Sequence, residues 1–454
     1  MKRPNRLALG VILAAACCAA PRHAAAGTDG GAAPNSPFQL EPLKDPSTVF
    51  LSAGPATAPV ESSNVATEGL LMQGLDQVGV GQWMTQNRIK AFGWIEGSYN
   101  YNFQNPEPRL NFGHLFDIQD SNAVINQLEV NVERTVNLSS QQFDVGGRID
   151  LLYGTDARFI HSSGLLAGSF PNPQYQFDIP QLYVDIAVPL VDGLRVRLGK
   201  FEFFKLTDPN ASPFFSHTYL YSTSGQSNSA SRLLSTGAGA ALPFTLTGIT
   251  GYYEFNKQVN LEAGLGRGYD QSLTDNNGAI DAFGRLNYKL SQETRASFAL
   301  ITGPEINHDN SHYRTVGDVS VAQSISENLL ILADGFYGVQ ARPTTLDGIA
   351  IGNDAHWYGL NGTAVYEISR NLSLAGRLEW YRDEQGFTTG FGRGVTLYEA
   401  TAGVTITPFP DSDAGRGLKI RPEIRYDFAD KHFFANTSPG GYQWIASVDA
   451  VYNF

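Results

Sequence analysis

The chain has 454 residues, with 32 Lys and Arg against 44 Asp and Glu, which gives a formal net charge of −12. Such acidity argues against nucleic acid and other polyanions as partners. The mean hydropathy is −0.19, and the sequence contains no apolar run long enough for a transmembrane helix, which argues against a helical membrane protein.

Residues 1–26 have the features of a signal peptide. Basic residues come first, an apolar stretch too short to span a bilayer follows, and three alanines before Gly27 fit a cleavage site. The only cysteines, Cys17 and Cys18, lie in this segment. Cleavage would remove both thiols and four basic residues, leaving a net charge of −12 − 4 = −16. The alternative is a lipoprotein signal in which Cys17 carries the lipid.

Residues 27–88 are predicted to form a periplasmic leader. The part from 27 to 62 is rich in Ala, Pro, Gly, Ser and Thr and has little periodicity, which is typical of disorder. Within 64–86, apolar residues recur at near-helical spacing, although two glycines weaken the pattern. This segment is either a short amphipathic helix that docks at the mouth of the following domain or a plain linker.

Residues 89–454 contain strand after strand, each near the length that a tilted membrane-spanning strand needs. The sixteen predicted segments are 89–103, 122–135, 142–154, 175–188, 194–203, 244–255, 259–268, 280–289, 295–303, 312–323, 329–341, 355–368, 372–384, 395–406, 418–428 and 441–454. The alternation of the fourth segment changes phase near Pro180, which predicts a β-bulge there.

The connectors alternate between long and short, as long extracellular loops and short periplasmic turns do in outer-membrane barrels. The long ones are 104–121, 155–174, 204–243, 269–279, 304–311, 342–354, 385–394 and 429–440. The short ones are 136–141, 189–193, 256–258, 290–294, 324–328 and 369–371, with 407–417 as an exception. The sequence therefore predicts an all-β fold, a transmembrane antiparallel up-and-down β-barrel of about 16 strands in the bacterial outer membrane.

Alternation within the strands assigns their faces. In 418–428 every second residue is charged, and because charge facing lipid costs a few kcal/mol near the bilayer midplane, the charged face must line the lumen. The candidate pore-lining residues are Lys90, Glu96, Asp144, Arg148, Asp150, Arg195, Arg197, Arg377, Glu379, Arg421, Glu423, Arg425, Asp427 and Asp449. The wider inward set adds Arg285, Arg295, Glu129, Asp185, Glu262 and Asp281. These charges either sort solutes or form ion pairs that only stiffen the wall.

The last strand, 441–454, has one apolar face and one mostly polar face, and it ends on an aromatic residue, Phe454. This ending resembles the signal by which the barrel assembly machinery recognises outer-membrane barrels. The alternative is the terminal strand of a soluble β-sandwich.

Four phrases together resemble one protein family. Ile89–Phe103 is similar to its opening strand, Gln181–Pro189 and Leu194–Phe201 to its fourth and fifth strands, and Leu261–Asp270 to a further recurring strand. The family is that of the outer-membrane β-barrel porins of the porin-2 type, the OmpL-like bacterial porins, and the resemblance covers most of 89–454. It implies an outer-membrane pore, with no catalytic residue to carry over.

A sixteen-stranded barrel is wide enough for an aqueous channel. The predicted function is a porin for passive diffusion of small hydrophilic solutes, and the alternative is a structural or adhesion barrel with a plugged lumen. The longest connector, 204–243, is the third outside loop, which in general porins folds inward and narrows the pore. Here it is either such a constriction or an ordinary surface loop.

No nucleophile elbow or other catalytic arrangement stands out, so no enzymatic activity, catalytic residue or cofactor is expected. His308, Asp309 and His312 are close in sequence, but they lie in an expected exposed loop, so no metal site is predicted. The expected partners are outer-membrane lipid, small hydrophilic solutes, the assembly machinery and, as an open question, further copies of the chain.

Overall fold

The residues that the computed structural model describes are 69–140, 142–166, 174–189, 193–203, 209–222, 241–343, 352–434 and 441–454. The predicted signal peptide, and the predicted leader up to residue 68, lie outside these residues.

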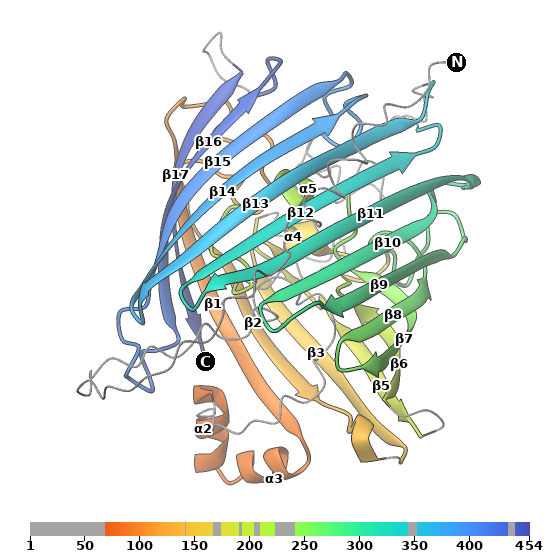
Figure 1. Cartoon of the computed structure of the whole chain (residues 1–454), viewed down its shortest axis with the longest axis vertical. Helices are drawn as coiled ribbons and strands as arrows, with labels where there is room; N and C mark the ends of the chain where they lie inside the picture. Colours follow the sequence, from red (N-terminus) through yellow and green to blue (C-terminus); the bar gives the residue numbers. More distant parts are fainter. Residues whose placement is uncertain are drawn as a thin grey trace, which may run out of the picture. The chain divides into compact units, whose positions relative to one another are not determined.

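The described residues form one antiparallel sheet whose first and last strands pair with each other, so that the sheet closes into a barrel (Figure 1). The strands are β1 (Ile89–Asn102), β2 (Ala123–Arg134), β3 (Asp144–Gly154), β4 (Gln176–Asp178), β5 (Leu182–Val188), β6 (Leu194–Phe201), β7 (Leu246–Asn256), β8 (Val259–Gly266), β9 (Asp281–Lys289), β10 (Thr294–Ile306), β11 (Asp309–Ser326), β12 (Leu329–Gln340), β13 (Ala355–Ser369), β14 (Leu372–Asp383), β15 (Val395–Ile406), β16 (Leu418–Ala429) and β17 (Tyr442–Asn453).

The barrel has sixteen strand positions, because β4 and β5 both pair with β3 and together occupy one of them. The break between them contains Pro180, which has no backbone N–H to donate to the sheet. This break is where the β-bulge is predicted: residues 179–181 lie opposite only 150–151 of β3, so the strand has one extra residue there. The predicted closed antiparallel barrel is confirmed.

The alternation of faces follows from the pleat of each strand. On β17, Trp444 and Val448 are exposed on the outside, whereas Gln443 and Asp449 are buried inside the barrel. The outer face therefore carries the apolar belt that lipid requires, and the charged side chains point into the lumen.

One predicted connector is wrong. We expected a long outside loop at 304–311, but β10 runs to Ile306 and β11 begins at Asp309. The polar residues there continue the ladder as a long hairpin, and His308 adopts φ = 60° in its two-residue turn. A polar hairpin tip outside the membrane needs no apolar face, so alternation gives no signal for it.

Some segments outside the strands form short helices. They are α2 (Leu70–Gln77), α3 (Gly81–Gln86), α4 (Ala157–Ile160) and α5 (Tyr219–Ser222), with a 3-10 turn at Leu138–Ser140. Among the described residues, no helix is long and apolar enough to cross a membrane. The expected amphipathic segment before the barrel is a pair of helices, since Gly79 with φ = 80° ends the first one. In Figure 1, α2 and α3 lie at the end of the barrel where β1 begins.

The barrel contains an apolar core that combines wall and loop side chains, which we call the lumenal cluster. It includes Leu115 and Phe116 from the first long connector, Phe159 and Ile160 from α4, Tyr219 and Leu220 from α5, and wall residues such as Phe201, Phe336, Trp357 and Tyr381. All of these side chains are buried. The connectors that carry these residues therefore fold into the barrel instead of extending from it.

Candidate functional site: the inward loop and the barrel wall

The third long connector enters the barrel. Of the predicted loop 204–243, the structure describes 209–222 and 241–243, and we call 209–222 the loop 3 segment. It carries Phe214 and Phe215, both buried, and ends in α5. Its hydrogen bonds with side chains of β14 and β16 show that it lies against the inside of the wall.

Arginines of the wall hold the backbone of the loop 3 segment. Arg421 donates through Nη1 to the carbonyl oxygens of Pro209 (2.5 Å) and Ser212 (2.8 Å). Two further arginines do the same: Arg377 Nη1 donates to the carbonyl of Ser216 at 2.8 Å, and Arg425 Nη1 to that of His217 at 2.6 Å. Charged donors make stronger hydrogen bonds than neutral ones, so three guanidinium groups fix the path of this segment.

Carboxylates of the wall accept the amide protons of the same segment. Glu423 accepts from the N–H groups of Phe215 (2.9 Å) and Ser216 (3.2 Å). Glu379 accepts from the N–H of Tyr219 at 2.9 and 3.0 Å, one to each oxygen. Because carbonyls meet arginines and amides meet carboxylates, the backbone of this largely irregular segment has hydrogen-bond partners inside the barrel.

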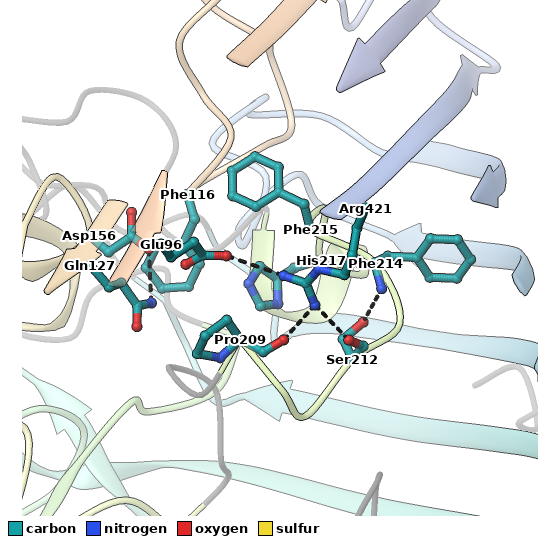
Figure 2. Close-up of a pocket in the computed structure, with 10 residues that line it drawn as sticks. All are labelled: Glu96, Phe116, Gln127, Asp156, Pro209, Ser212, Phe214, Phe215, His217 and Arg421. Carbon is teal, nitrogen blue, oxygen red and sulfur yellow. Dashed lines mark hydrogen bonds and ion pairs between the residues drawn. The ribbon is translucent and has the colours of Figure 1, made fainter. Parts of the chain in front are cut away.

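A small pocket marks where three inward connectors meet the wall (Figure 2). Its lining residues are Glu96, Phe116, Gln127, Asp156, Pro209, Ser212, Phe214, Phe215, His217 and Arg421. At its centre, Arg421 also donates to Glu96 at 3.2 Å and through Nε to Asp449 at 3.0 Å. One guanidinium therefore connects β1, β16 and β17 with the loop 3 segment.

Two titratable groups outside the strands face this pocket. Burial, together with nearby arginines, lowers the pKa of His217 to about 4, so its imidazole is neutral at physiological pH. Burial raises the pKa of Asp156 to about 7, although Gln127, Asn126 and Thr155 donate hydrogen bonds to its carboxyl group. The pocket can therefore lose or gain a proton near neutrality at Asp156.

The first long connector has an anchor of its own. The buried ring of His114 contacts Asp117 through Nδ1 (2.5 Å) and Asp427 of β16 through Nε2 (2.8 Å). With both carboxylates ionised, both ring nitrogens must donate, which requires the imidazolium form. Burial alone would lower the pKa of His114, but Asp117 and Asp427 outweigh burial and raise it above its ordinary value.

We predict that this anchor weakens at alkaline pH. A raised pKa means that the stabilisation is complete below the ordinary pKa of about 6.5 and is lost as the pH rises through the folded-state value. If the pKa of His114 is one pH unit higher in the folded state than in the unfolded state, the folded state gains about 1.4 kcal/mol of stability. Arg425, His217 and Tyr219 also face the group formed by His114, Asp117 and Asp427.

The measurement is the temperature at which the folded, fast-migrating gel band disappears, recorded from mildly acidic to alkaline pH. The wild-type protein should lose heat resistance at alkaline pH, whereas His114→Gln should start lower and show less pH dependence. A variant that keeps the wild-type pH profile would exclude His114 as the titrating group.

A second charged group occupies the wall from β3 to β8. Arg197 forms a bidentate ion pair with Asp185, with both hydrogen bonds at 2.7 Å, and Arg148 donates to Asp150 at 2.6 Å. Arg195 lies 3.8 Å from Glu262. Here the charges pair with each other along the wall rather than with the loop 3 segment.

Comparison with known families decides the identity of the chain. Residues 88–204 and 235–454 match the family described as "Putative beta-barrel porin-2, OmpL-like". The chain belongs to this family. It is an outer-membrane porin, a diffusion channel and not an enzyme.

Solved structures agree on the fold of this porin. It is similar to the trimer form of OmpT from Vibrio cholerae, with 12% identity over 81% of this chain and 99% of that chain at a TM-score of 0.50. It is also similar to OprB from Pseudomonas putida, with 12% identity over 84% of this chain and 97% of that chain at a TM-score of 0.50. A comparison with curated proteins gave no match.

The candidate pore-lining residues of the porin all lie on the inward face, but they divide into three groups. Those on β1, β14, β16 and β17 are buried under or beside the inward connectors; they are Glu96, Arg377, Glu379, Arg421, Glu423, Arg425, Asp427 and Asp449. Those on β3 and β6 form the second charged group; they are Arg148, Asp150, Arg195 and Arg197. Lys90 is exposed at the end of the barrel where β1 begins, which we call the turn end because the short turns lie there. Asp144 at the same end pairs with Arg88 and Arg134.

Sequence reasoning missed His114, Phe116 and His217, because it treated the connectors of the porin as surface loops or as a single constriction. A signal was present, since Leu110 to Ile118 carries five large apolar side chains in a predicted outside loop. Such density is unusual for a segment in water. His312 forms a hydrogen bond with Asp309 at the β10–β11 turn, and among the described residues no cluster suited to a metal ion is found.

Proposed function

We propose that this porin is a narrow channel for passive diffusion of small hydrophilic solutes, and that the loop 3 segment sets its constriction. One observation carries the proposal: Arg377, Arg421 and Arg425 donate hydrogen bonds to backbone carbonyls of this segment and hold it inside the barrel. A segment held by buried charges keeps one position, as a size filter requires.

The charges near the constriction support weak ion selectivity. Arg421 is paired with Asp449, Arg425 with Asp427, and Arg377 with Glu399. Paired charges cancel at a distance, and salt screens the remainder over about 8 Å at physiological ionic strength. The acidic composition of the chain favours cations, so a weak cation preference is expected.

We predict steady single-channel steps of small conductance in planar bilayers, together with a small reversal potential of the sign of a cation preference under a salt gradient. Clear anion selectivity would mean that the arginines of β16 dominate the field at the constriction. Larger uncharged sugars should fail to enter the channel, as measured by liposome swelling. Conductance like that of an open sixteen-stranded pore would contradict the proposed constriction.

One observation favours a second candidate, a structural or adhesion barrel with a plugged lumen. The lumenal cluster spans from the inward connectors to the far wall, with Phe116, Tyr219 and Trp357 as members. Complete absence of conductance, in protein shown to be folded by its gel mobility, would favour the plug.

We also propose two partners. The terminal Phe454 supports recognition by the barrel assembly machinery. One similar structure is described as a trimer form, which supports a homo-oligomer in this protein as well. The mass of the detergent-solubilised protein, measured by light scattering, decides between a monomer and an oligomer.

A further inference from the structure

The helix pair before the barrel exposes three apolar side chains. Val78 is 71% exposed, Val80 is 43% exposed and Trp83 is 59% exposed. We call these three residues the helix-pair face. Exposure of a tryptophan and two valines within six residues of sequence is unfavourable in water, so a medium other than water must be considered for these side chains.

Other side chains of the helix pair dock on the barrel. Met72 of α2 and Met84 of α3 are buried against Ala91 of β1, and the backbone N–H of Ala91 lies 3.3 Å from the sulfur of Met72. A side chain at Gly69 would come within 3.3 Å of the backbone of Phe454. The helices are therefore fixed beside the seam where β1 meets β17.

Alternation along β1 shows which side of the wall the helices cover. Ala91 has the same parity as Ile95 and Tyr99, which are exposed on the outer face. Ala91 is directly opposite Val132 of β2, which is also exposed on the outside. The helices thus cover the outer face of the wall at its turn end and continue the lipid-facing belt.

The composition of the helix pair suits the boundary between lipid and water. Between residues 69 and 87, Asp76 is the only charged residue. Amphipathic helices that lie in a membrane interface bury one apolar face at the boundary between headgroups and acyl chains, and Trp is enriched at this depth.

We propose that the helix pair α2–α3 binds phospholipid of the periplasmic leaflet through the helix-pair face, so that the porin has an interfacial anchor outside its barrel. The turn end of the barrel faces the periplasm, and the helix-pair face continues the belt of Ile95 and Val132 that lipid covers. The anchor concerns lipid alone and does not depend on the proposed constriction.

A nitroxide label tests this proposal. Cys17 and Cys18 are the only cysteines of the chain, so the full chain with both replaced by Ser accepts a single new cysteine. Trp83→Cys places the label on the helix-pair face. Thr85→Cys, at an exposed position about 200° around the same helix from Trp83, is the matched control, and Leu378→Cys, 68% exposed on the outer face of β14, reports on lipid.

The labelled proteins are folded into vesicles of phosphatidylethanolamine and phosphatidylglycerol, and folding is checked by gel mobility. Collision rates are then measured with oxygen, which concentrates in lipid, and with a nickel chelate, which stays in water. We expect the ratio of oxygen to nickel collisions at position 83 to be several-fold higher than at position 85 and closer to that at position 378.

Equal ratios at positions 83 and 85 would overturn the proposal, because the helix-pair face would then be in water. A label at 83 shielded from both reagents would also overturn it and would indicate a protein surface, such as a second copy of the chain. Should the Trp83→Cys protein fail to fold, Val78→Cys gives a second reading on the same face.

Discussion

Single-channel conductance should rise when Arg421 is replaced by glutamine. This substitution removes the donors to Pro209 and Ser212 and leaves Glu96 and Asp449 without their cation. Breaking a buried ion pair from one side costs about 3–5 kcal/mol. Since about 1.4 kcal/mol corresponds to a factor of ten, such a loss would shift the docking of the loop 3 segment by more than a hundredfold.

The control is Arg370→Gln. Arg370 pairs with Asp411 at 2.8 Å, but the two side chains are 57% and 79% exposed. Exposed pairs contribute about 0–1 kcal/mol, so this variant should conduct and resist heat like the wild type. If Arg421→Gln folds and conducts like Arg370→Gln, then the loop 3 segment is not held in the way proposed.

Deleting Phe454 should sharply reduce the amount of folded protein in the outer membrane. Its backbone N–H donates to the carbonyl of Gly93 at 2.9 Å, and the N–H of Gly93 donates to its carbonyl at 3.0 Å. A Cβ on Gly93 would come within 2.9 Å of the Phe454 ring. The last residue thus supplies both a pair of hydrogen bonds at the seam and an aromatic ring that fits against glycine.

Two substitutions separate these contributions. Phe454→Ala keeps the backbone hydrogen bonds and removes the ring, so it should give an intermediate yield, whereas Phe454→Tyr should assemble normally. The readout is the heat-sensitive fast band in the outer-membrane fraction. Protein that does assemble should conduct normally, because the contacts of the terminal residue described above are with the seam and not with the loop 3 segment. Full assembly of the deletion variant would show that the terminal aromatic residue is dispensable.

The strands could be predicted from the sequence because every second residue of a membrane-spanning strand faces lipid and must be apolar. In β16 a one-residue change of register would turn Arg421 and Arg425 toward lipid, so the pattern fixes the face of each residue. Pro180 marked the break between β4 and β5 for a local reason, its missing N–H. The hairpin around His308 lacked both signals and was missed.

The partners of the inward charges could not be predicted in the same way. Alternation places Arg377 and Glu423 in the lumen but does not say whether water or protein meets them there. Their partners are backbone groups of the loop 3 segment, such as the carbonyl of Ser216, and a backbone group has no sequence signature. Likewise, the contact of His114 with Asp427 spans 313 positions of the chain.

The lumenal cluster also affects how the barrel melts. In an open, water-filled barrel the inward side chains are hydrated both before and after unfolding, so they contribute little to the change in heat capacity. Here Phe336, Trp357 and Tyr381 are dry in the folded state and become hydrated when the chain unfolds. Exposure of apolar surface raises the heat capacity by roughly 0.45 cal/K/mol for each Å². The stability of this porin should therefore curve more strongly with temperature than that of a hollow barrel of equal strand number, and its interior should behave like the core of a soluble protein.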